Sequence, residues 1–166
     1  MDFLIGDIKM NNIKTKKEEH EKYMSIALEE AQKAFDQDEV PVGAVMVKDG
    51  IIIAKAYNQV EKEGSVLCHG EILAIKEASK VLGNKFLNGC TLYVTLEPCT
   101  MCSGAILNSR IDTLVYGANE EKTGTAGTVL NLLQFPSFPN FVHIVPNILE
   151  EESAKLLQNF FQKKRR

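Results

Sequence analysis

The sequence lacks any apolar run that approaches the roughly 20 residues needed to span a bilayer. Its first ten residues carry two aspartates and one lysine, which is a poor match to the positively charged start of a signal peptide. The chain has only four cysteines. Without a secretion signal, they suggest a reducing compartment in which thiols bind metals and do not form disulfides. These observations predict a cytoplasmic protein that makes no membrane contact.

An excess of positive charge is also missing. The chain has 22 acidic and 19 basic residues, a net charge of −3, so as a whole it does not look like a nucleic-acid-binding protein. Its 166 residues, 45% apolar and 25% charged, are ordinary for one globular domain. Basic residues gather at Lys163, Lys164, Arg165 and Arg166. Charge alone favours a solvated helix end over a tail that contacts phosphates.

Two short segments do contain the residue types of a hydrolytic metal site. The imidazole of His69 and the thiolates of Cys99 and Cys102 supply three ligands for Zn²⁺, whereas a closed structural site has four. The fourth position is then free for the water that a catalytic zinc activates. Glu71, two residues after the histidine, is the expected general acid and base. The two cysteines, three apart, share one face at the positive start of a predicted helix, which favours their thiolate forms.

Other interpretations of these residues stay open. A redox Cys-x-x-Cys pair would leave His69 and Glu71 without a role. A closed structural zinc site would need Cys68 as a fourth ligand, but adjacent residues seldom reach the same tetrahedral ion. The remaining cysteines and histidines are interpreted as lying outside the metal site: Cys68, Cys90, His20 and His143.

The spacing of apolar residues predicts alternating helices and strands after a polar start. Residues 1–17 are expected to form a flexible extension ahead of a single domain, residues 18–166. Helices are expected at 18–35, 69–82, 98–108 and 149–162, and strands at 42–47, 51–57, 91–96, 113–117 and 141–145. This order predicts a three-layer α/β/α domain with a central mixed five-stranded sheet. Both ligand segments then begin helices and can converge at one end of the sheet.

Four segments carry a resemblance to a known family: Glu39–Ala44, Thr91–Cys99, Asn108–Ile111 and Lys122–Gly124. They resemble the bacterial tRNA-specific adenosine deaminases, which convert the wobble adenosine-34 of tRNA anticodons to inosine. The H-x-E and P-C-x-x-C motifs are typical of the wider zinc-dependent deaminase superfamily. The last two segments indicate the tRNA branch. The resemblance covers residues 20–165, nearly the whole domain.

The resemblance implies a cytidine-deaminase-like fold and a homodimer with active sites near the interface. It also implies one Zn²⁺ per subunit, held by His69, Cys99 and Cys102, with Glu71 as the catalytic residue. The implied substrate-binding residues are Asn58, Gly70, Val42 and Glu97. The residues implied to contact RNA, at the anticodon stem-loop, are Lys122, Lys163, Lys164, Arg165 and Arg166. With the resemblance in view, phosphate contact becomes the preferred interpretation of the basic tail.

Two positions depart from the family pattern. Gly70 replaces the usual alanine of the H-x-E motif, and Glu120 stands where aspartate is usual. The expected function is deamination of adenosine in tRNA. The alternative is deamination of a free nucleobase or nucleoside such as cytosine or guanine. A non-catalytic RNA-binding subunit is a third hypothesis, but it gives Glu71 no role.

Overall fold

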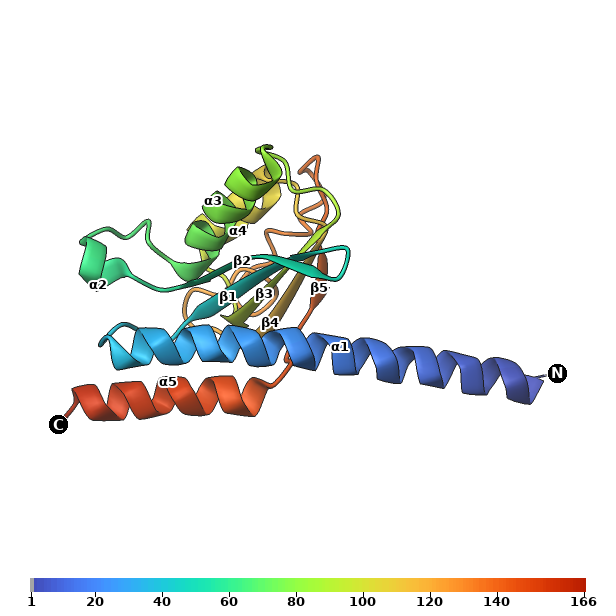
Figure 1. Ribbon diagram of the computed structural model, residues 1–166, viewed down its shortest axis with the longest axis horizontal. Coiled ribbons are helices and arrows are strands. Elements are labelled where there is room, and N and C mark those ends of the chain that lie inside the picture. The colour runs from blue at the N-terminus through green and yellow to red at the C-terminus, as the bar shows by residue number, and fades with distance from the viewer. Residues whose placement is uncertain (1) are drawn as a thin grey trace.

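A five-stranded mixed sheet forms the centre of the protein, as the sequence predicts (Figure 1). The computed structural model describes the backbone of residues 2–166 and the side chains of residues 9–166. The elements in chain order are α1 (Asp2–Asp36), β1 (Gly43–Lys48), β2 (Ile51–Tyr57), α2 (Val60–Glu63), α3 (Gly70–Leu82), β3 (Cys90–Leu96), α4 (Thr100–Asn108), β4 (Thr113–Ala118), β5 (His143–Val145) and α5 (Glu150–Lys164).

The strands lie in the order β2-β1-β3-β4-β5. β1 pairs antiparallel with both β2 and β3, whereas β3–β4 and β4–β5 are parallel. Asp49 and Gly50 both have positive φ, as a tight turn between β1 and β2 requires. β3 occupies the middle of the sheet, which explains its nearly continuous apolar sequence.

Helices cover both faces of the sheet, with α1 and α5 on one side and α3 and α4 on the other (Figure 1). α1 crosses β1 at Gly43, where a Cβ atom would lie 2.0 Å from the carbonyl oxygen of Ala27. α3 packs with the small residues Ala74 and Ala78 inward, both fully buried. The starts of α3 and α4 are therefore fixed to one hydrophobic core, and these are the two points where the sequence places the metal ligands.

The structure departs from the expected elements in several places. α1 begins at Asp2, so the segment predicted as an irregular extension is helical, although residues 9–19 are all exposed. Unpacked helical turns are marginally stable in water, and the flexibility of residues 1–17 stays a prediction. The short helix α2 lies within the predicted loop 58–67. On α5, Phe160 is buried but Phe161 is 46% exposed. Across residues 2–166, the helices are all too short or too polar to cross a membrane.

Candidate active site

His69 and Cys99 are the N-cap residues of α3 and α4. Side chains at N-caps usually accept hydrogen bonds from the first turn of the helix, but neither of these does so. Both side chains are therefore available to a ligand at the positive ends of two helices. Pro98 precedes the N-cap, so α4 begins at Thr100, two residues later than the predicted helix 98–108. Cys102 follows in the first turn of α4 and is fully buried.

The three candidate ligands meet at one point, with their donor atoms within 4.8 Å of one another. Nδ1 of His69 lies 3.4 Å from Sγ of Cys102 and 3.8 Å from Sγ of Cys99. Tetrahedral Zn²⁺ with ordinary bond lengths would separate a nitrogen and a sulfur ligand by about 3.6 Å. The spacing of the donor atoms therefore fits one tetrahedral zinc ion. Within the described side chains, this is the one His/Cys/Asp/Glu cluster with metal-binding geometry, and neither Cys68 nor Cys90 belongs to it.

The three candidate ligands interact with one another through hydrogen bonds that shift their pKa values. A hydrogen bond with Cys102 lowers the pKa of Cys99 to about 3, and the same contact raises the pKa of Cys102. The hydrogen bond to Cys99 likewise raises the pKa of His69. The protein alone therefore shares protons among these groups. A divalent metal would displace those protons, because its ligands must be thiolate and neutral imidazole.

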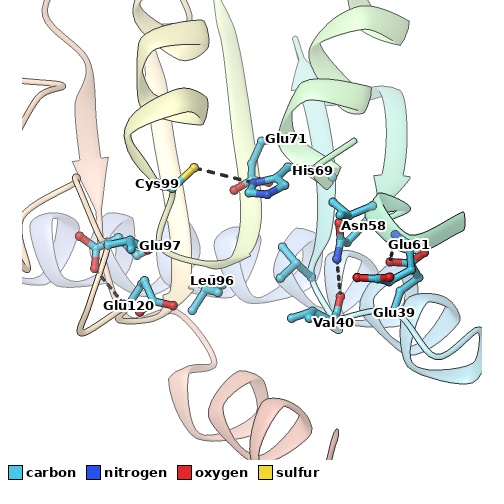
Figure 2. A pocket seen from close by; sticks show the side chains of 14 residues that line it. Glu39, Val40, Asn58, Glu61, His69, Glu71, Leu96, Glu97, Cys99 and Glu120 are labelled. Carbon is cyan, nitrogen blue, oxygen red and sulfur yellow. Dashed lines mark hydrogen bonds between the residues drawn. The ribbon is translucent and has the colours of Figure 1, made fainter. Parts of the chain in front are cut away.

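Glu71 lies beside this cluster in the first turn of α3 (Figure 2). It is 4% exposed, and burial raises its pKa. The charges of His69 and Cys99 both act on its carboxyl group, which places it near the metal ligands without being part of their cluster. A carboxyl group in this position can exchange protons with a molecule held against the metal.

A cavity of about 240 Å³ opens in front of the cluster. One wall comes from the chain before β1 and the segment after β2, and the other from the end of β3 and the loop after β4 (Figure 2). The cavity admits a single base and is far too small for a duplex. The predicted substrate-binding residues all line it: Asn58, Gly70, Val42 and Glu97.

The side chain of Asn58 has one polar atom whose hydrogen-bonding capacity is unused. Its side chain is 7% exposed, and its Nδ2 donates to the carbonyl oxygen of Val40 at 3.2 Å. Its Oδ1 is buried and accepts no hydrogen bond from the described residues, and Asn58 is one of the residues that line the cavity. A buried polar atom without a partner is costly, so a donor on a bound molecule would satisfy it. The backbone N–H of Asn58 donates to the carbonyl oxygen of Val42, which joins the two segments of this wall.

Glu97 lines the opposite wall, but both of its carboxylate oxygens already accept hydrogen bonds from the loop after β4. Its assignment as a substrate contact stays a prediction. The predicted RNA-contacting residues lie outside the cavity. Lys122 is exposed on the same loop, and Lys163, Lys164, Arg165 and Arg166 are exposed at the end of α5.

The sequence patterns miss two features of this site. Glu39 is 1% exposed and accepts hydrogen bonds from the backbone N–H groups of Glu61 and Lys62, in α2. A charged residue just before an apolar strand gives no periodic signal for such a role. Lys62 lines a second hollow beside the cavity, together with Lys164.

The histidines interpreted as outside the site are indeed elsewhere, since His20 contacts Tyr93 and His143 lies exposed in β5.

Comparisons with known proteins agree with this geometry. The MafB19-like deaminase family matches residues 18–165. A tRNA-specific adenosine deaminase of Bacillus subtilis is 48% identical over 88% of this chain and 91% of its own length. A structure from studies of A-to-I editing by tRNA:A34 deaminases is 42% identical, with a TM-score of 0.78, and covers 81% of this chain and 97% of its own. A guanine deaminase from Nitrosomonas europaea shares the fold alone, at 24% identity and a TM-score of 0.70, covering 84% of this chain and 83% of its own.

The levels of identity and coverage decide between the two deaminase groups that the sequence leaves open. Identity near one half extends over nearly the full length of the B. subtilis relative, whereas the guanine deaminase shares less than a quarter of its residues. The metal-ligand cluster, the adjacent Glu71 and the cavity are the parts that a deaminase requires. This chain belongs to the MafB19-like deaminases and, among them, to the family of the tRNA-specific adenosine deaminases.

Proposed function

We propose that the protein hydrolyses adenosine to inosine at the wobble position of tRNA anticodons, with one Zn²⁺ per subunit. The observation that carries the proposal is the meeting of His69, Cys99 and Cys102 beside Glu71 at the cavity, in a chain of this family. The named relative acts on tRNA, as its description states. The cytoplasm, where we expect tRNA to be modified, is the proposed location.

The donor set supports zinc as the metal. One imidazole and two thiolates are borderline-soft ligands that suit Zn²⁺, and their spacing matches its bond lengths. When bound, zinc would supply a Lewis acid that lowers the pKa of water to about 7. The three side chains would hold the ion against the cavity, and Glu71 would remain outside the ligand set.

Glu71 would perform the proton transfers. Its carboxyl group would take a proton from the attacking water and deliver it to N1 of adenine, and would then assist departure of the amino group as ammonia. Burial of Glu71 keeps bulk water away from these transfers. Asn58 Oδ1 would accept a hydrogen bond from the substrate and fix its orientation.

The size of the cavity supports a flipped base as the bound group. A base in an anticodon loop is single-stranded and can leave its stack at low cost. The phosphates on either side of this base would remain outside the cavity, where positively charged lysine side chains lie. The second hollow shares Glu39, Val40 and Glu61 with the cavity, and Lys62 and Lys164 line it. The basic end of α5 therefore lies next to the proposed entry point of the RNA.

An exposed apolar surface supports the proposed homodimer. It lies in the segment that follows β4, where Leu132 and Phe138 line a hollow together with Gly104 and Leu107 of α4. The exposed large apolar residues of this segment are Val129, Leu130, Phe135, Phe138 and Phe141. Such a patch is typical of a protein interface. We expect Phe141→Asp to lower the molar mass measured by sedimentation equilibrium toward that of the monomer, while the protein retains zinc. An unchanged mass would contradict this interface.

The deciding experiment is to incubate the purified protein with total tRNA and to sequence the product for inosine. We expect inosine at the wobble position with the wild-type protein and none with Glu71→Gln. Adenosine, cytosine and guanine should be tested in parallel for ammonia release. Release from a free base, combined with no inosine in any tRNA, would replace this proposal with the small-molecule alternative.

A further inference from the structure

Two buried carboxylates stand on opposite sides of the active-site cavity, and the chemistry proposed above uses neither. They belong to Glu39 and Glu97, which are 1% and 2% exposed. Figure 2 shows them at the two sides of the cavity, with the His69 ring between them. A carboxylate can accept about four hydrogen bonds, so each can hold several donors from a neighbouring segment.

Glu97 holds the loop that follows β4. Its Oε1 accepts from the backbone N–H groups of Ala126 and Thr128, both at 3.0 Å. Its Oε2 accepts from the N–H of Glu120 at 3.1 Å and from the hydroxyl of Thr128. One side chain therefore binds both ends of the 120–128 segment, which forms part of the cavity wall.

The fit between this loop and Glu97 is close. A Cβ atom at Gly124 would lie 2.5 Å from Glu97 Oε2 and 2.5 Å from the carbonyl oxygen of Glu120. Only glycine leaves room for the carboxylate at this point of the loop. The loop is thus built around the side chain of Glu97.

Glu39 acts on the other wall in the same way. Its carboxylate accepts from the N–H groups of Glu61 at 3.1 Å and Lys62 at 2.7 Å, in the first turn of α2. The N-cap residue of α2, Gln59, makes no side-chain cap, so Glu39 satisfies these donors from a distant part of the sequence. A helix of four residues is not stable without such contacts.

We propose that Glu39 and Glu97 are positioning residues that set the two walls of the active-site cavity. Each carboxylate binds backbone donors of a segment that has no stable secondary structure of its own. Together they fix the width of the cavity and so the place of the bound base relative to His69 and Glu71. The kinetic part of this inference rests on the proposed function, whereas its structural part stands on the fold alone.

The test compares Glu97→Gln and Glu39→Gln with the wild-type protein, all loaded with zinc. Glutamine keeps the shape of the side chain but turns an NH₂ group toward N–H donors, so part of each set of hydrogen bonds is lost. NMR hydrogen exchange should quicken about tenfold or more at the amides of residues 120, 126 and 128 in the first variant. The second variant should show the same change at residues 61 and 62. In each variant, the exchange rates of the amides on the other wall of the cavity should stay at the wild-type values.

Kinetics provide the second readout. Both variants should retain zinc, and kcat/KM on an anticodon stem-loop should fall by about 10²-fold per zinc-bearing molecule, since a small misplacement of a reacting group has an effect of this size. kcat and KM should be measured separately, well below the unfolding transition, because a purely stabilising role would leave both unchanged in the folded fraction. Matched controls are Glu121→Gln and Glu63→Gln, which remove the same charge from exposed positions in the same two segments. Both controls should behave as wild type.

Thr128→Val is a milder variant in case Glu97→Gln does not fold. It removes the hydroxyl donor and leaves the carboxylate in place, so we expect faster exchange of the same loop and a smaller loss of kcat/KM. Unchanged exchange at the designated amides would overturn the proposal, as would wild-type kcat and KM, or equal losses in the controls. If the wild-type protein deaminates no RNA, the proposed function fails, and the exchange measurements still decide the positioning role.

Discussion

At the scale of single residues, the roles proposed for Glu71 and for the three candidate metal ligands can be tested directly. Glu71→Gln should retain zinc and the fold but lose about 10²–10⁴-fold in kcat, because glutamine cannot carry protons. Cys102→Ala should lose both zinc and activity, since an incomplete ligand set remains. Zinc content by atomic spectroscopy and turnover measured on the same samples separate the two cases. Loss of zinc in Glu71→Gln would identify Glu71 as a ligand.

Gly70 stands between His69 and Glu71 in the H-x-E motif. A Cβ atom there would lie 3.4 Å from the carbonyl oxygen of Val42 and 3.5 Å from the nitrogen of Asn58, which is ordinary contact. Because α3 begins at this position, alanine should raise the free energy of unfolding by about 0.4–1 kcal/mol. Zinc content and kcat/KM should change little, since the backbone N–H remains.

Gly117→Ala is the matched control for Gly70→Ala. At Gly117 the added Cβ would lie 2.3 Å from Ser153 Oγ and 2.6 Å from the carbonyl oxygen of Thr95, so this variant should be strongly destabilised. Thermal unfolding of both variants makes the comparison. A lower melting temperature for Gly70→Ala would show that the wall beside Val42 cannot accommodate a methyl group.

At the scale of secondary-structure elements, the basic end of α5 lies beside the cavity, and we propose that it contacts the RNA there. Lys164 pairs with Asp38 at 2.5 Å, and Phe160 packs against Phe35 of α1, so the helix end is held next to the second hollow. Replacing all four cations of 163–166 by glutamine should raise KM for an anticodon stem-loop with nearly constant kcat. The dependence of binding on salt should become shallower, because fewer counterions are released.

The start of α1 offers a control with the same change of charge. The N-terminal half of α1, which extends away from α5 (Figure 1), carries four lysines at positions 9, 14, 16 and 17. Replacing them by glutamine should leave KM and the salt dependence close to wild type. Equal effects of the two sets would mean that net charge, and not the place of α5, governs RNA binding.

At the scale of the whole molecule, the candidate metal site is anchored to a fold that has its own core. The ligands occupy the starts of α3 and α4, which pack on the same sheet. A chelator should therefore leave the protein folded but less stable. Zinc at 100 times its Kd adds about 2.7 kcal/mol, so removing it should lower Tm by about 5–10 °C in a chain of this size.

Cys99→Ala provides the reference for this measurement. Without chelator, this variant should already have a lower Tm than the wild-type protein. Its Tm should not change when the chelator is added, because it cannot hold the metal. Calorimetry with and without chelator supplies the data. Complete unfolding of the wild-type protein in chelator would show that the metal, and not the hydrophobic core, holds the two helices together.

The sequence by itself determined the family, the fold class and the residue types of the candidate metal site. Helix and strand patterns depend on neighbouring residues within one turn or one pleat, so their order could be predicted from spacing. The interval between Cys99 and Cys102 is also local, and it brought both thiols together at the start of α4. The H-x-E motif is local as well, and it brought Glu71 to the first turn of α3.

The tertiary structure alone decided how the cavity is closed and which groups remain free inside it. Glu39 reaches the amides of α2, and Glu97 reaches a loop 23 to 31 residues further along the chain. The same folding leaves the Oδ1 atom of Asn58 without a hydrogen-bond partner among the described residues. These contacts join backbone groups of irregular segments to side chains that are distant in the sequence. Irregular segments leave no repeating pattern of apolar residues from which such contacts could be predicted. They depend on which segments the sheet brings together, because only a folded core excludes water and so requires each buried donor to find an acceptor.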